Sequence, residues 1–158
     1  MITLKSVKYY AGMSEETHAY SATVYFNNRP CAKVSNRGHG GPDEEYITNQ
    51  AAWKDMMLYI AALPKKKSSF FPDGMPQDLE GICCDLVNDF YAARDLKRLM
   101  AKRVVYTRKG KPGIYQTQCV KAATLDKWIK QIGDDYKTER VLNSTPFTAA
   151  LAIFKGAT

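Results

Sequence analysis

The amino-acid sequence predicts an α+β protein: an N-terminal antiparallel sheet (a β-hairpin plus a strand) with two helices, then a basic unit of β-hairpin, helix, strand and helix. Three observations predict it. Apolar and polar residues alternate in the first third of the chain, which is typical of strands with one buried face. Apolar residues recur at helical spacing in the middle third. Both patterns return over short distances in the last third, separated by Gly and Pro turns.

The first third of the chain predicts a small sheet. Residues 2–10 form its first strand, and residues 18–27 show the clearest alternation of apolar and polar side chains. Residues 27–29 begin with two asparagines, which tolerate the left-handed conformation of a tight hairpin turn. Residues 31–35 are the returning strand. Three glycines and a proline then predict a loop over residues 37–45.

The middle third predicts two helices. The first follows Thr48, whose hydroxyl can cap it, and it ends before Pro64. A loop over residues 64–77 carries three lysines, two phenylalanines and three prolines. The second helix starts at residue 76 or 78 and continues to about residue 102, with one apolar stripe along its length.

The last third predicts four short elements. Residues 103–107 and 114–119 form a hairpin around a basic turn, and residues 124–133 form a helix between a Thr cap and a terminal Gly. Residues 139–142 form a short strand. The last helix starts at Thr145, because a capping hydroxyl precedes a proline at the first helical position.

Length and composition limit the class of protein. The 158 residues suit a single α+β domain over residues 1–158, with sub-units 1–63 and 78–158 joined by the 64–77 loop. An apolar fraction of 45% and a charged fraction of 25% are ordinary for a folded protein and exclude disorder. Apolar runs are short and residues 1–15 hold no signal peptide, so we expect no membrane partner.

The cysteines predict neither a metal nor a disulfide. The four cysteines show no zinc-binding spacing, either with one another or with the two histidines, and Cys83 directly precedes Cys84. No nucleotide-binding loop or other cofactor motif is present in the sequence. We therefore expect reduced thiols, no metal, no cofactor and a cytosolic location.

Positive charge is concentrated in the last third. Residues 101–158 hold 11 Lys or Arg and 4 Asp or Glu, which accounts for the whole net charge of +7. The densest part, which we call the basic ridge, consists of Arg94, Lys97, Arg98, Lys102, Arg103, Arg108, Lys109 and Lys111, with Tyr106 and Tyr115 beside them. Such a ridge favours a nucleic-acid backbone or an acidic protein surface as partner. Alternatively, its cations only complement the end of a helix and a hairpin turn.

Two loops form a second candidate site. Because residues 18–27 and 29–36 pair as antiparallel strands, the loops before and after this hairpin emerge at the same end of the sheet. Loops 14–18 and 36–41 would then bring together four titratable side chains, Glu15, Glu16, His18 and His39. Carboxylates and imidazoles could perform acid–base catalysis or bind a metal. The alternative is a structural clasp in which glycines supply the turns.

The chain resembles a family of small proteins encoded by bacteriophages and prophages. The resemblance rests on residues 14–25, SEETHAYSATVY, and residues 34–41, VSNRGHGG, and it extends to residues 104–107, 114–117 and 141–152. It implies a phage accessory protein that acts in the cytoplasm of the bacterial host. It carries over no catalytic residue.

Three functions from different classes follow. The first is non-catalytic binding, through the basic ridge, to nucleic acid or to a host protein that handles it. Inhibition of a host defence system such as CRISPR-Cas belongs to this class. The second is a small enzyme with its site at loops 14–18 and 36–41. The third is a self-associating structural phage protein whose charge only maintains solubility.

Overall fold

The computed structural model describes residues 1–157, and the chain divides into two compact units. Unit 1 is Met1–Asn88, and unit 2 begins at Asp89. The boundary lies within helix α2 (Leu79–Met100), whereas the sequence predicts a single domain with sub-units 1–63 and 78–158 joined by loop 64–77. That loop belongs entirely to unit 1, where Lys66 and Met75 exchange backbone hydrogen bonds of 2.9 and 3.0 Å. Because the loop is closed in this way, its proline- and lysine-rich composition does not mark a linker.

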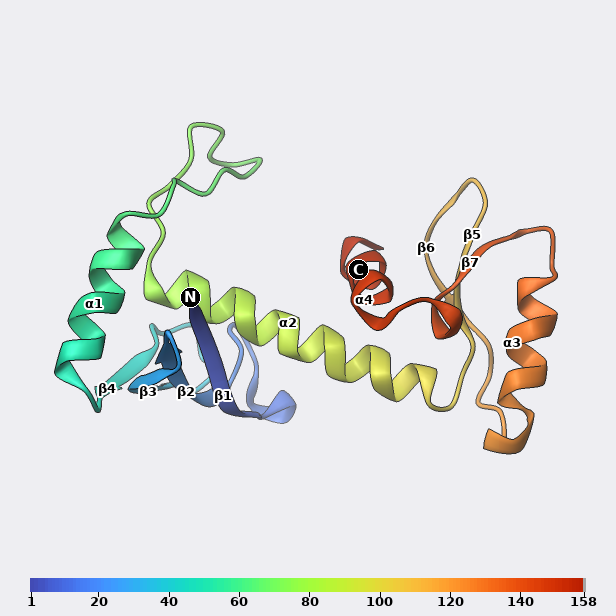
Figure 1. The fold of residues 1–158 in the computed structure, drawn as a ribbon, viewed down its shortest axis with the longest axis horizontal. Coiled ribbons are helices and arrows are strands. Elements are labelled where there is room, and N and C mark those ends of the chain that lie inside the picture. The colour runs from blue at the N-terminus through green and yellow to red at the C-terminus, as the bar shows by residue number, and fades with distance from the viewer. Residues whose placement is uncertain (158) are drawn as a thin grey trace. The chain divides into compact units, whose positions relative to one another are not determined.

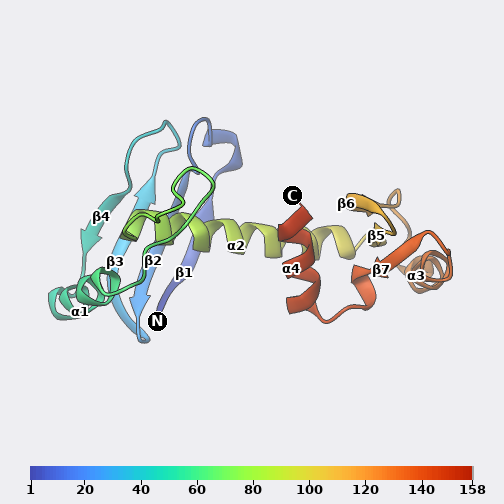
Figure 2. The ribbon, with the colours of Figure 1, turned by 90° about the horizontal axis from the view of Figure 1, so that it is seen from above.

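Unit 1 contains the predicted antiparallel sheet, with one strand more than expected. The strands run β1-β2-β3-β4 in spatial order (Figures 1 and 2). Their bounds are Ile2–Tyr9, Tyr20–Phe26, Arg29–Asn36 and Glu44–Ile47. A 3₁₀ turn, Ala11–Met13, lies between β1 and β2. The α+β class predicted from the sequence is confirmed.

The β2–β3 hairpin is built as the sequence predicts. Asn27 and Asn28 have φ angles of 47° and 62°, so both adopt the left-handed conformation of the turn. Alternate β2 residues are buried from Tyr20 to Phe26. Strand β4 was not predicted and begins inside the expected loop 37–45. All four of its residues are exposed, so no alternation of buried and exposed positions marks it.

Helices α1 (Gln50–Ala61) and α2 complete unit 1. The cap of α1 is Asn49 and not Thr48, because the Asn49 side chain accepts a hydrogen bond from the Ala52 amide. Helix α1 buries every fourth residue, namely Ala52, Met56 and Ile60. The first part of α2 crosses one face of the sheet and buries Leu79, Cys83 and Val87 with the same spacing (Figure 2).

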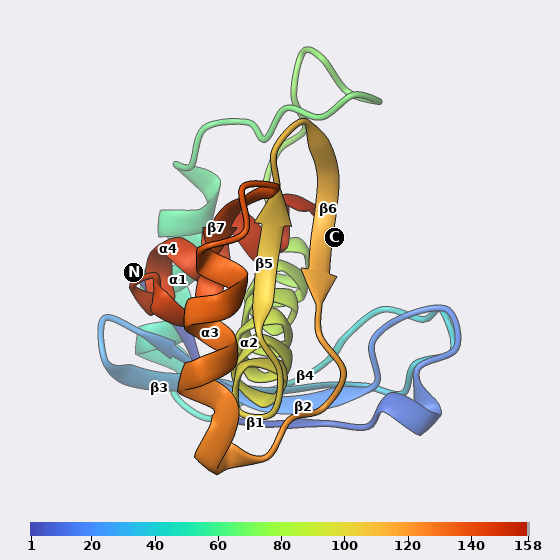
Figure 3. The ribbon, with the colours of Figure 1, turned by 90° about the vertical axis from the view of Figure 1, so that its right-hand side faces the viewer.

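Unit 2 holds a three-stranded sheet with β5 in the centre, flanked by β6 and β7 (Figure 3). The strands are Val105–Arg108, Lys111–Gln116 and Thr138–Val141. Two 3₁₀ turns, Ala122–Thr124 and Leu142–Ser144, precede helices α3 (Leu125–Gly133) and α4 (Phe147–Ala157). Its buried core consists of Leu96, Val105, Leu142 and Ala150.

Two local predictions in unit 2 are corrected. The β5–β6 turn has two residues, Lys109 and Gly110, and not the six expected from the basic run. Gly110 supplies a φ of 67°, which permits this tight turn. Thr124 does not cap α3, because its hydroxyl donates to the carbonyl of Lys121. Gly133 is the last residue of α3, and the C-cap is Asp134 in ordinary helical conformation.

Candidate functional site

The two loops of the predicted acid–base site meet through their backbones. The amides of Glu15, Glu16 and Thr17 all donate to the carbonyl of Gly38, at 3.0, 3.0 and 3.4 Å. Gly38 has a φ of 88°, and a Cβ there would lie 2.1 Å from the Met13 carbonyl oxygen. Only glycine fits this position, so the glycine serves the contact between the loops.

The four predicted side chains do not converge on one cavity. His39 Nδ1 lies 3.1 Å from Glu15 Oε2, but both side chains are more than half exposed. His18 instead contacts helix α2, with Nε2 at 2.6 Å from Asn88 Oδ1. The Glu16 carboxylate lies beside Gly40. His39 and His18 line two different hollows of the surface. The structure therefore brings Glu15 to His39, whereas His18 contacts helix α2 and lines a different hollow.

Between these loops lies a polar network that the sequence analysis did not identify. The Tyr20 hydroxyl donates to Asp43, and the Asn36 amide donates to Asp43 Oδ1 at 3.0 Å and to the Gly41 carbonyl at 2.9 Å. Asn36 also accepts a hydrogen bond of 2.8 Å from the Thr17 hydroxyl. Tyr20 is the residue from which this network could have been predicted, since a buried tyrosine usually needs a hydrogen-bond partner for its hydroxyl.

Three groups in or beside this network have a raised pKa. Burial, with a hydrogen bond to Asp43, raises the pKa of Tyr20 far above its ordinary value. Burial and the charge of Asp43 raise the pKa of the Cys83 thiol to about 12. The pKa of Glu80 is also raised, by burial and then by Asp43. The adjoining hollow is only about 60 Å³. These properties suit a structural clasp better than an active site.

No metal site emerges from the side chains of residues 1–157. In that part of the chain, no three His, Cys, Asp or Glu residues gather so that they could hold an ion.

The helical part of the basic ridge lies on the surface of α2 and just beyond it. Arg94 stacks over the Tyr91 ring at 4.8 Å, and Lys97 lies 5.0 Å from the centre of the Phe147 ring. Arg98 is 74% exposed and is 3.5 Å from Asp95. Lys102 is exposed, and Arg103 donates to the Thr117 carbonyl at 3.2 Å. The predicted exposed face is therefore present, with Arg103 hydrogen-bonded to the residue that follows β6.

Asn143 anchors the end of α2 to the sheet of unit 2. Its amide donates to the carbonyls of Met100 and Arg103 at 3.1 and 2.9 Å, and its Oδ1 accepts from the Val105 amide at 2.7 Å. Three backbone groups at the helix-to-strand turn are satisfied by this one side chain. The two parts of the ridge are thereby joined by a fixed connection.

In the hairpin part of the ridge, the two predicted tyrosines hold an arginine. The Arg108 guanidinium carbon lies 4.7 Å from the centre of the Tyr115 ring and 5.6 Å from that of Tyr106. Arg108 Nη2 donates to the Tyr106 hydroxyl at 3.2 Å. Tyr106 is only 8% exposed. The Tyr106 ring is therefore not exposed for stacking on a nucleic-acid base, because it is buried against Arg108.

Beside this arginine is a cavity of about 410 Å³ with a strongly cationic wall. Its lining residues are Arg108, Lys109, Lys111, Tyr136 and Lys137. The Lys109 amide donates to the Lys137 carbonyl at 3.0 Å, which joins the two turns that form the cavity. Tyr136 and Lys137 were not predicted. Their position depends on the pairing of β5 with β7, which no local pattern indicates.

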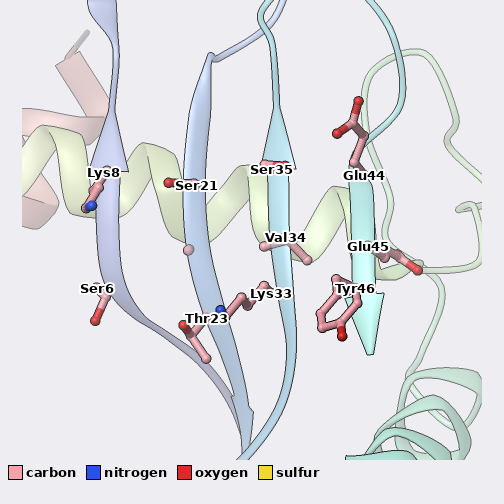
Figure 4. Close-up of a pocket in the computed structure, with 11 residues that line it drawn as sticks. Ser6, Lys8, Ser21, Thr23, Lys33, Val34, Ser35, Glu44, Glu45 and Tyr46 are labelled. Carbon is pink, nitrogen blue, oxygen red and sulfur yellow. The ribbon is translucent and has the colours of Figure 1, made fainter. Parts of the chain in front are cut away.

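A larger hollow of about 540 Å³ lies over the exposed face of the unit 1 sheet (Figure 4). Its labelled side chains come from all four strands and include Lys8 and Lys33 as well as Glu44 and Glu45. Both signs of charge are present, so this face shows no preference for anions.

The two units differ in charge. Unit 2 holds 14 Lys or Arg against 6 Asp or Glu, a net charge of +8, whereas unit 1 holds 9 against 10, a net charge of −1. Across residues 1–157, none of the helices is both long enough and apolar enough to cross a membrane. Comparisons with protein-family models, curated proteins and solved structures find no match to this chain.

Proposed function

We propose that this protein binds nucleic acid without catalysis and that unit 2 is the binding unit. The observation that carries the proposal is the separation of charge, +8 on unit 2 against −1 on unit 1. A phosphate backbone is the commonest polyanion that such a surface meets in a cell. Lys and Arg side chains bind it by displacing its counterions, which supplies sequence-independent affinity.

The state of the individual cations supports this proposal. Within residues 1–157, the side-chain cations of Lys102, Arg108, Lys109, Lys111 and Lys137 form no ion pair with a carboxylate, although the Asp135 carboxylate accepts a hydrogen bond of 3.0 Å from the backbone amide of Lys137. These charges are therefore available to an outside anion. Phosphate contacts fix position and register, whereas sequence is read by contacts with base edges. We accordingly propose binding with little sequence preference.

The resemblance to phage-encoded proteins suggests the biological context in which this binding takes place. We infer a phage accessory protein that acts in the bacterial cytoplasm, with inhibition of a defence system such as CRISPR-Cas as one role. The alternative partner is a host protein that handles nucleic acid and presents an acidic surface, whose charge would complement the ridge.

The test compares two charge-matched variants of the full chain. Arg98→Glu with Lys102→Glu reverses two exposed charges of the ridge, and Lys65→Glu with Lys67→Glu reverses two exposed charges of the 64–77 loop. Both variants have the same net charge. We expect the ridge variant to bind a short labelled DNA about tenfold more weakly or worse in fluorescence anisotropy, and the loop variant to bind nearly as the wild type does.

Equal losses in the two variants would mean that only net charge matters and would contradict a binding surface on unit 2. Absence of binding by the wild type would overturn the proposal. A pull-down from bacterial lysate, with and without nuclease, then identifies a protein partner if capture survives the nuclease.

A further inference from the structure

We propose that the cavity beside Arg108 is a subsite for single-stranded nucleic acid, in which the cations hold a phosphate and Tyr136 stacks on an unpaired base. This inference rests on the proposed function and deepens it, because it names the form of nucleic acid that unit 2 prefers. It depends on the cavity itself and on two residues outside the basic ridge.

Arg108 is held in place by aromatic rings and not by a carboxylate. The two rings at 4.7 and 5.6 Å and the hydrogen bond to the Tyr106 hydroxyl fix the plane of the guanidinium. Its Nε is buried and has no hydrogen-bond partner among residues 1–157. The group keeps its full positive charge and is oriented before any ligand arrives. A planar, fixed guanidinium matches the geometry of phosphate oxygens.

Three lysines add point charges around the same space. Lys111 faces Arg108 across the two-residue turn, and Thr138, next to Lys137, pairs with Arg108 on the other side. The backbone hydrogen bond from Lys109 to Lys137 keeps the two turns together. The volume of about 410 Å³ falls within the range of small-ligand sites, roughly 300–1,000 Å³. One phosphate group with its sugar is therefore a suitable occupant.

Tyr136 gives the site its preference for single strands. The residue is 76% exposed, and the Lys137 ammonium lies 5.4 Å from the centre of its ring. An exposed ring beside bound phosphate is the usual platform for base stacking in single-strand binding. In a duplex, the faces of all but the terminal bases are covered by their neighbours, so unpaired bases offer far more surface for stacking on this ring.

The other hollows and exposed patches of the molecule indicate a particular ligand less clearly. The hollow on the unit 1 sheet mixes lysines with glutamates. Phe71 of the 64–77 loop lines a hollow of about 230 Å³ beside the ion pair of Lys66 and Asp85, where the two charges compensate each other and favour no charged ligand. The hollow beside Tyr20 and Asp43 has room for little more than water.

The experiment measures the affinity of the full chain for a labelled single-stranded DNA and for its duplex, at one salt concentration. We expect tighter binding of the single strand. Tyr136→Ala should weaken single-strand binding about 5- to 150-fold, since stacking on one aromatic ring contributes about 1–3 kcal/mol. Duplex binding should change much less. Tyr136→Trp should retain the single-strand affinity, because it preserves the stacking surface.

Tyr46→Ala is the matched control, since Tyr46 is 70% exposed on unit 1 and its loss should leave both affinities unchanged. Tyr136 is itself exposed, so its replacement does not disturb the core. Equal or tighter binding of the duplex, or an unchanged affinity in Tyr136→Ala, would overturn this inference and leave the proposed function standing. Failure of the wild type to bind either DNA would overturn both.

Discussion

Cys83 and Tyr20 show how a few residues of unit 1 depend on being protonated. Both are buried next to Asp43, and both have a raised pKa for that reason. Ionising either one would place a second negative charge beside the carboxylate in a poorly hydrated space. The cluster is therefore stable as a neutral phenol and thiol around one anion.

The raised pKa of Cys83 predicts alkaline destabilisation. The thiol ionises near 8.5 in an unfolded chain and at about 12 in the folded one, so the folded state holds the extra proton between these values. Its contribution to stability is complete below pH 8.5 and is lost as the pH rises toward 12. In urea unfolding over this pH range, the free energy of unfolding should fall more steeply in the wild type than in Cys83→Ala, by up to about 1.4 kcal/mol per pH unit.

Cys119→Ala is the control for this measurement. Cys119 is exposed, so its removal should leave the pH dependence of the wild type intact. A Cys83→Ala variant with the same slope as the wild type would show that the buried thiol does not carry the effect.

At the scale of elements, strands and helices were predictable where their burial follows a simple period. Strand β2 alternates along its whole length, and α1 buries every fourth residue. Strand β4 escaped prediction because all its residues are exposed and its partner β3 dictates its conformation. The central position of β5 was not predicted either, since its pairing with β7 joins residues that are 30 or more positions apart.

The start of α1 provides a test at the same scale. Thr48 and Asn49 are both good capping residues, so sequence alone does not choose between them. The structure assigns the cap to Asn49. Asn49→Ala should lower the free energy of unfolding by about 1 kcal/mol in urea denaturation, and Thr48→Ala by much less. The reverse order would place the cap one residue earlier.

For the candidate sites, the sequence predicted which segments lie close together better than it predicted what each side chain contacts. The antiparallel hairpin correctly brought loops 14–18 and 36–41 together. It could not show that His18 turns toward Asn88, because that contact depends on helix packing 70 residues away. Likewise, the basic ridge could be recognised in the sequence as a run of cations. Tyr136 lies beside the hairpin part of the ridge only because of the way in which unit 2 folds.

At the scale of the whole molecule, the division of charge is the main property. A count along the sequence locates the excess in the last third, and the contacts place the division between Asn88 and Asp89. One unit of the chain is nearly neutral, and the other is a polycation. This separation distinguishes a localised binding surface from a protein that is basic throughout.

The salt dependence of binding tests the central claim most directly. If at least four of the 14 Lys or Arg residues of unit 2 each neutralise one phosphate, log K for a single-stranded DNA should fall against log salt with a slope of about −3 or steeper. The measurement is anisotropy of the full chain between about 50 and 200 mM salt. A slope of this size supports phosphate binding by unit 2. A slope near zero, or no binding at the lowest salt, would contradict it.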